Sequence, residues 1–65
     1  MSSTDALEQT IREYLAQVPP GERIETLALA TTILGQLNDM RPIEDARALI
    51  RREATARGVA WWDEK

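Results

Sequence analysis

The sequence predicts an all-α fold, a compact three-helix bundle with helices over about residues 5–18, 22–38 and 42–57 and a C-terminal Trp-Trp segment. Apolar residues recur at helical spacing, and proline and glycine separate the periodic segments. No window alternates apolar and polar residues with the β-branched enrichment typical of strands. The chain has 65 residues, which is enough for a single helical domain over residues 1–65.

The first helix is expected to begin near Asp5 and to end before Pro19. Ser3, Thr4 or Asp5 can serve as its N-cap, because a short polar side chain there accepts a free backbone N–H. One helical face is apolar and comprises Leu7, Ile11, Tyr14, Leu15 and Val18. A residue that precedes proline avoids the α region, so the helix should stop at Val18.

The second helix is the most apolar segment of the chain. After Glu25 it carries no charge as far as Leu37, whereas a surface helix normally has one charged face. It must therefore be covered on more than one side, either by the other two helices of a monomer or by a second molecule. Gly35 lies in its interior at a cost of about 1 kcal/mol relative to alanine, which predicts a close approach of another helix there. Its apolar run of about 14 residues, with Gly and Gln inside it, is too short for a membrane span, which needs about 20.

The third helix has clear signals at both ends. Pro42 suits the first helical position, and the acidic Glu44 and Asp45 suit the positive end of the helix dipole. Gly58 is a good residue just past the helix end, where Val59 can complete a Schellman motif. The apolar stripe between these ends comprises Ile43, Ala46, Leu49, Ile50 and Ala54.

The composition argues against an enzyme and against a metal or cofactor site. The chain has no Cys and no His, which removes disulfides and the usual ligands of zinc. The adjacent carboxylates of Glu44 and Asp45 would diverge by about 100° on a helix, and no glycine-rich phosphate loop is present. The N-terminus resembles no signal peptide, so a cytoplasmic location is expected.

Protein–protein contact is the leading functional hypothesis. A core this small contributes only a few kcal/mol of net stability, and a twofold homodimer is the commonest way to bury a further face. We therefore expect a small non-enzymatic regulatory or adaptor protein that binds itself, another protein, or both. The expected partner-binding residues lie on one edge of the second helix, on its exposed side around Leu29, and at the C-terminus: Ala28, Leu29, Thr32, Gly35, Trp61 and Trp62. The competing interpretation is that one tryptophan folds back over the bundle while the other stays partly exposed.

A nucleic-acid-binding transcription regulator is the alternative hypothesis. It would use arginines of and beside the third helix to contact phosphates, namely Arg41, Arg47, Arg51 and Arg52. Two observations weaken it. Glu44 and Asp45 would meet the bases first if this helix entered a groove. The arginines also fit a solvated face with pairs such as Glu44–Arg47 and Glu53–Arg57.

Overall fold

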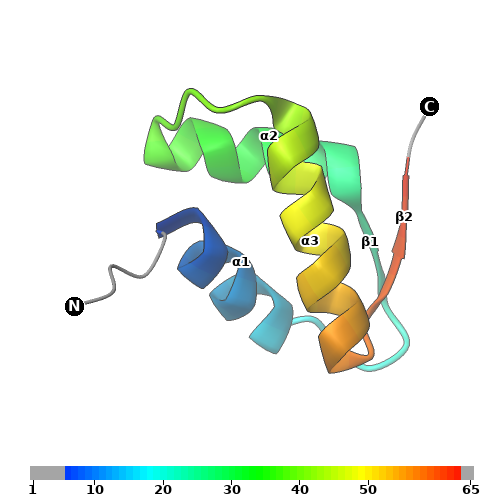
Figure 1. The fold of residues 1–65 in the computed structure, drawn as a ribbon. Helices are drawn as coiled ribbons and strands as arrows, with labels where there is room; N and C mark the ends of the chain where they lie inside the picture. The colour runs from blue at the N-terminus through cyan, green and yellow to red at the C-terminus, as the bar shows by residue number, and fades with distance from the viewer. Residues whose placement is uncertain (1–5, 64–65) are drawn as a thin grey trace.

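The computed structural model describes residues 6–63, which form three helices and two short strands (Figure 1). The elements in chain order are α1 (Ala6–Ala16), β1 (Arg23–Glu25), α2 (Thr26–Leu37), α3 (Ile43–Arg57) and β2 (Ala60–Trp62). The fold is mostly helical and has the three expected helices. It is not purely all-α, because the two strands pair in a small parallel sheet.

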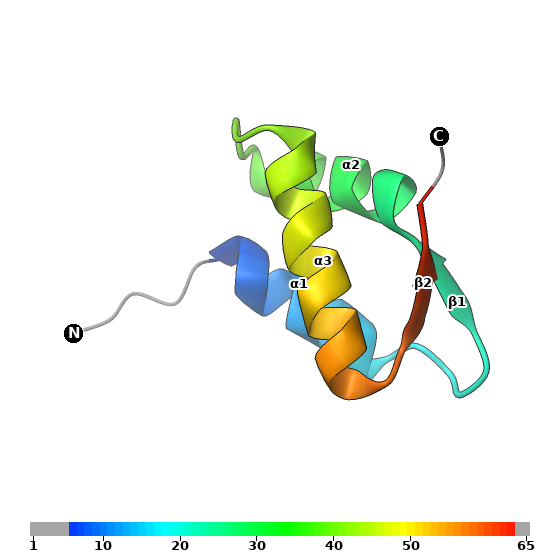
Figure 2. The ribbon, with the colours of Figure 1, turned by 45° about the vertical axis from the view of Figure 1, so that its right-hand side comes forward.

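The core lies where the three helices meet. In Figures 1 and 2, α3 lies across both α1 and α2. The buried apolar residues of the three helices form one cluster. Leu7 and Ile11 of α1 and Ile50 of α3 are completely buried. The remaining buried apolar residues are Leu15, Ile24, Leu29, Ala30, Ile33, Leu34, Ala46 and Ala54. The apolar periodicity of the sequence therefore identified most of the inner faces of α1 and α3, with Tyr14 and Ile43 as the exposed exceptions.

The expected start of the second helix is wrong by about four residues. Gly21 turns the chain with a positive φ of 87°, and residues 23–25 are extended as β1. The helix begins only at Thr26, after Glu25 caps it. The Glu25 side chain accepts the backbone N–H groups of Leu27 and Ala28, both at 2.8 Å. Glu25 was expected inside the first turn of this helix. It instead precedes the helix and accepts two of the backbone N–H groups that have no partner within it.

The Trp-Trp segment forms the second strand. Beyond α3, β2 runs parallel to β1, with Ala60 opposite Arg23, Trp61 opposite Ile24 and Trp62 opposite Glu25. Figure 2 shows the two strands side by side at one edge of the helices. Parallel strands need a long crossover between them, which α2 and α3 provide here.

The other helix ends agree closely with the sequence signals. Asn38 adopts the left-handed conformation (φ 53°) at the end of α2, and α3 begins directly after Pro42, which is its N-cap. Gly58 (φ 74°) ends α3 in the expected Schellman motif, with the Val59 N–H bonded to the Ala54 carbonyl at 2.8 Å. The predicted cap at Ser3, Thr4 or Asp5 lies outside the described residues. None of the described helices combines the length and the apolar character needed to cross a membrane.

Candidate functional site

The helix α2 has one buried face and one exposed face, and neither carries a charge. Its buried residues are Thr26, Leu29, Ala30, Ile33 and Leu34. Its exposed residues are Ala28, Thr31, Thr32, Gly35 and Gln36, which are small or uncharged. The helix is therefore covered on one side by its own chain, and an uncharged side remains open in a protein of which 29% is charged.

The partner-binding residues predicted on this helix do not all lie on its exposed face. Ala28 and Thr32 are exposed one turn apart, as expected. Leu29 is only 7% exposed and belongs to the core, so the expectation of an exposed side around it is wrong. The close approach expected at Gly35 is also absent from the described chain, because a Cβ added there would meet no neighbouring atom within 4 Å. The reason is rotational: α1 and α3 pack on the Leu29–Ile33 side of α2, away from Gly35.

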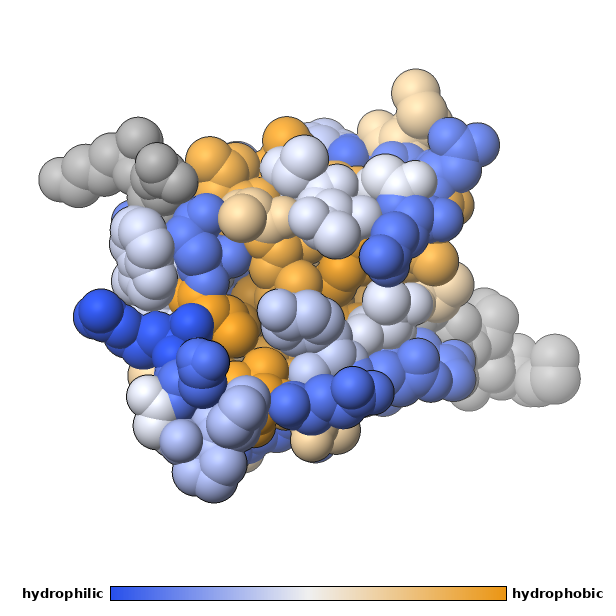
Figure 3. All heavy atoms as spheres, turned by 180° about the vertical axis from the view of Figure 1, so that it is seen from behind, coloured by the Kyte–Doolittle hydropathy of each residue, from blue (hydrophilic) through white to orange (hydrophobic). Residues whose placement is uncertain are grey.

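A shallow apolar hollow lies between α1 and α2. We call it the α1–α2 groove and define it by its uncharged lining residues Tyr14, Ile24, Ala28, Leu29 and Thr32. The charged Arg23 and Glu25 of β1 complete the lining of a volume of about 270 Å³. A second hollow of about 430 Å³ continues it along α1 and shares Tyr14 and Ile24. Figure 3 shows apolar side chains in the middle of this face with hydrophilic ones around them. The groove is thus an exposed apolar area with a polar border, which is typical of interaction sites.

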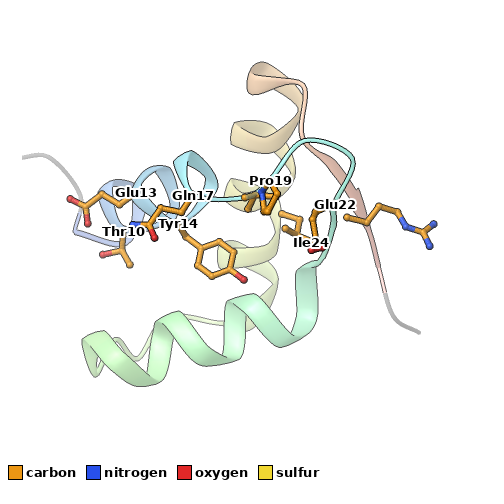
Figure 4. A pocket seen from close by; sticks show the side chains of 9 residues that line it. Thr10, Glu13, Tyr14, Gln17, Pro19, Glu22 and Ile24 are labelled. Atoms are coloured by element: carbon orange, nitrogen blue, oxygen red, sulfur yellow. The ribbon is translucent and has the colours of Figure 1, made fainter.

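Tyr14 is the residue of this groove that the sequence did not identify. Its spacing placed it in the buried stripe of the first helix, yet the side chain is 48% exposed. Figure 4 shows the ring extending from α1 into the space beside α2, with Pro19 and Ile24 nearby. Its position at the edge of the stripe was the available signal. Such an aromatic side chain offers a large contact area at low cost in conformational entropy.

Charges of both signs border the groove. Glu22 and Arg23 line the same hollow as Tyr14 and are exposed. Within residues 6–63, neither side chain makes a hydrogen bond or an ion pair. Most other charged side chains of the described chain do have such partners, so these two opposite charges are available to a binding partner.

Two further exposed apolar residues lie at the far end of α2. Met40 is 91% exposed and Ile43 is 40% exposed, and both line a separate hollow with Gly35. The sequence placed Ile43 in the buried stripe of the third helix. It lies in the first turn of α3, beyond the end of the core, which explains its exposure.

The two tryptophans have different environments. Trp61 is partly buried against the core, donates its indole N–H to the Thr55 hydroxyl at 3.0 Å, and lies under the Arg51 guanidinium at 5.9 Å. Trp62 is 44% exposed. One tryptophan therefore covers the bundle and the other remains available, because successive strand residues point to opposite faces.

Two of the arginines proposed for nucleic-acid contact bind the side-chain carboxylate of Asp63 instead. Arg47 approaches Asp63 at 3.2 Å, and Arg51 at 3.1 Å. The Thr26 hydroxyl also donates to this carboxylate. These hydrogen bonds, that of Thr26 first, hold the pKa of Asp63 below its ordinary value. Arg47 is also only 13% exposed, so the expected solvent-facing row of arginines does not form.

The other two arginines proposed for nucleic-acid contact, Arg41 and Arg52, are also engaged within the chain. Arg52 pairs with Glu8 at 2.7 Å, and Arg41 pairs with Asp39 at 3.1 Å. The buried Glu53, which is 8% exposed, accepts from Arg12 at 3.2 Å. The Arg12 hydrogen bond outweighs burial and lowers the pKa of Glu53. This network ties α1 to α3 and leaves little unpaired positive charge for a polyanion.

The described part of the chain contains no cluster of three or more acidic side chains that could hold a metal ion. The carboxylates of Glu8 and Glu53 both face arginines, which makes them poor metal ligands because their charge is already compensated. The described residues therefore form two features that could bind a partner: the α1–α2 groove, and the pocket of Thr26, Arg47 and Arg51 that holds the Asp63 carboxylate. No family model matches the chain, and neither curated proteins nor solved structures yield a match.

Proposed function

We propose that this chain is a small non-enzymatic regulatory or adaptor protein that acts as a homodimer through the α1–α2 groove. The observation that carries the proposal is the exposed, uncharged face of α2 beside the half-exposed ring of Tyr14. Small residues such as Ala28 and Thr32 would allow a second helix to approach this face closely.

The charges at the border of the groove favour a second copy as the partner. In a twofold interface the same patch faces itself, so each Arg23 can meet the Glu22 of the other copy. These two residues have opposite charges and no side-chain partner within the described chain. Exposed ion pairs add little affinity, but they fix the orientation of two copies. Chain size supports the same choice, since domains of about 60 residues bury only about 60% of their surface.

Nucleic-acid binding is the weaker candidate. Arg47, Arg51 and Arg52 each pair with carboxylates of the same chain, so binding a phosphate backbone would require breaking these pairs. The net charge of −3 would also repel a polyanion at long range. We expect no retardation of DNA or RNA in a gel even at low salt, where such binding is strongest.

The homodimer is tested by the mass in solution, measured by light scattering. The wild-type chain should show about twice the chain mass of 7.3 kDa. Thr32→Arg places a long charged side chain in the groove and should shift the mass to that of one chain. Ala48→Arg is the matched control, because Ala48 is exposed on α3, away from the groove. It should leave the mass at that of the dimer.

Circular dichroism of both variants verifies that the helices are retained, because each substitution is at an exposed helical position. A monomeric wild-type chain at several hundred micromolar would contradict the proposal. A dimer that Thr32→Arg leaves intact would place the interface elsewhere and would contradict the assignment to this groove.

A further inference from the structure

The last described residues of the chain are bound to the rest of the molecule as a peptide ligand would be. Residues 60–62 add a strand to β1 in parallel register. Asp63 then places its carboxylate among three donors from other elements: Thr26 at the start of α2, and Arg47 and Arg51 on α3. Main-chain pairing together with a specific side-chain pocket is the usual mode of peptide recognition by strand addition.

The carboxylate pocket is a built site, because its donors are also held by groups of the chain other than Asp63. The Thr26 side chain is completely buried. Arg47 donates to the Thr26 hydroxyl at 3.3 Å and is also held by Glu44 at 3.0 Å. Arg51 contributes its Nε to both carboxylate oxygens of Asp63, at 3.3 and 3.1 Å. Charge-assisted bonds of this kind are stronger than neutral ones.

The bound segment is held with little burial. Only Val59 and Trp61 of this region pack against the core, and both only partly. Ala60 and Trp62 are exposed. Segments with few buried apolar contacts open at lower free energy than the core. We therefore expect residues 60–63 to open at lower free energy than the packing among α1, α2 and α3.

We propose that the β1 edge, together with Thr26, Arg47 and Arg51, is a docking site for an extended segment of a partner protein that carries an aromatic residue followed two positions later by a carboxylate. Residues 60–63 occupy this site in cis and are displaced when such a segment binds. The seated sequence defines the required chemistry. Trp61 lies under Arg51 and bonds Thr55, and Asp63 fills the pocket. The site shares the strand β1 with the α1–α2 groove, but its carboxylate pocket of Thr26, Arg47 and Arg51 lines no part of that groove.

The test uses the full chain with the substitution Asp63→Asn, which weakens the internal ligand but keeps the pocket. A tethered segment competes at an effective concentration of about millimolar, so the wild-type chain should resist displacement. The probe is a fluorescent peptide with the sequence of residues 58–63, Gly-Val-Ala-Trp-Trp-Asp. Fluorescence anisotropy should show binding to Asp63→Asn at least tenfold tighter than to the wild type. The same peptide with Asn as its last residue should lose at least tenfold in affinity.

Two controls locate the binding. Amide chemical shifts in the Asp63→Asn chain should change at β1 and Thr26 when the peptide is added. Thr32→Arg, introduced into the same chain, should leave peptide affinity unchanged, so this result is independent of the homodimer. Equal affinity for the Asp and Asn peptides, no binding at millimolar concentration, or shifts confined to Tyr14, Ala28 and Thr32 would each overturn the proposal. If Asp63→Asn does not fold by circular dichroism, Asp63→Glu, which keeps the charge but misplaces it, takes its place.

Discussion

At the scale of single residues, Glu25 shows how a correct chemical expectation can be attached to the wrong geometry. Its negative charge was expected to favour the first turn of the second helix. In the structure it lies just before that helix, and each of its oxygens accepts one backbone N–H. Glutamate is an uncommon cap, so propensity could not distinguish a residue in the turn from one that precedes it. The extended backbone that enables this role depends on β2, which is far away in the sequence.

Glu53 is a second residue whose role depends on tertiary structure. Its expected partner was Arg57, one turn later, and that pair is present at 3.8 Å. The closer partner is Arg12 of α1 at 3.2 Å, which no local pattern could indicate. A nearly buried carboxylate must be compensated to remain ionised, and this arginine both compensates it and joins two helices.

The lowered pKa of Glu53 predicts that the chain loses stability in acid. Because the pKa is lower in the folded state than its ordinary value of 4.5, the ionised carboxylate stabilises the fold above that value, and this contribution is lost as the pH falls through the folded pKa. Urea unfolding at pH values from 6 to 2.5 should show a falling midpoint. Glu53→Gln should be less stable at pH 6 and less sensitive to acid, with the remaining dependence due partly to Asp63. Identical pH slopes for the two proteins would contradict this role.

At the scale of elements, the helices were predictable and the strands were not. Helix periodicity is a local pattern, and the exits at Asn38 and Gly58 follow from residues that tolerate positive φ. A three-residue strand gives too little pattern to recognise, and its partner lies more than 30 residues away. The parallel sheet exists because α3 returns the chain to Ile24, so its pairing depends on the packed helices.

Substitution of glycine by alanine should change the stability of the chain in opposite directions at Gly58 and at Gly35. Gly58 ends α3 with φ 74°, so Gly58→Ala should destabilise the chain by about 1 kcal/mol because alanine is strained there. Gly35 lies inside α2, where an added Cβ meets nothing within 4 Å. Gly35→Ala should therefore stabilise the chain by about 0.5–1 kcal/mol through helix propensity. Chemical denaturation of the two variants tests the contrast, and a destabilising Gly35→Ala would indicate a close contact at that position.

At the scale of the whole molecule, the sequence predicted that one helix lacks a charged face but not where the open area lies. The exposed strip of Ala28 and Thr32 was identified correctly, because both lie on the same side of a helical wheel. The groove beside it depends on the angle at which α1 meets α2 and on the outward position of Tyr14. Leu29 was misplaced for the same reason. The local pattern gives the faces of a helix, whereas packing decides which of them is covered.

The homodimer predicts that thermal stability depends on protein concentration. Association through the α1–α2 groove stabilises only the folded state, so each tenfold rise in concentration above the dissociation constant should add up to about 1.4 kcal/mol. The unfolding temperature, followed by circular dichroism from about 5 to 500 µM, should rise for the wild-type chain and for Ala48→Arg. It should be constant for Thr32→Arg, which cannot associate. A constant unfolding temperature in all three proteins would mean that the fold is maintained by one chain alone, and that its uncharged helical face is stable in water without a second copy.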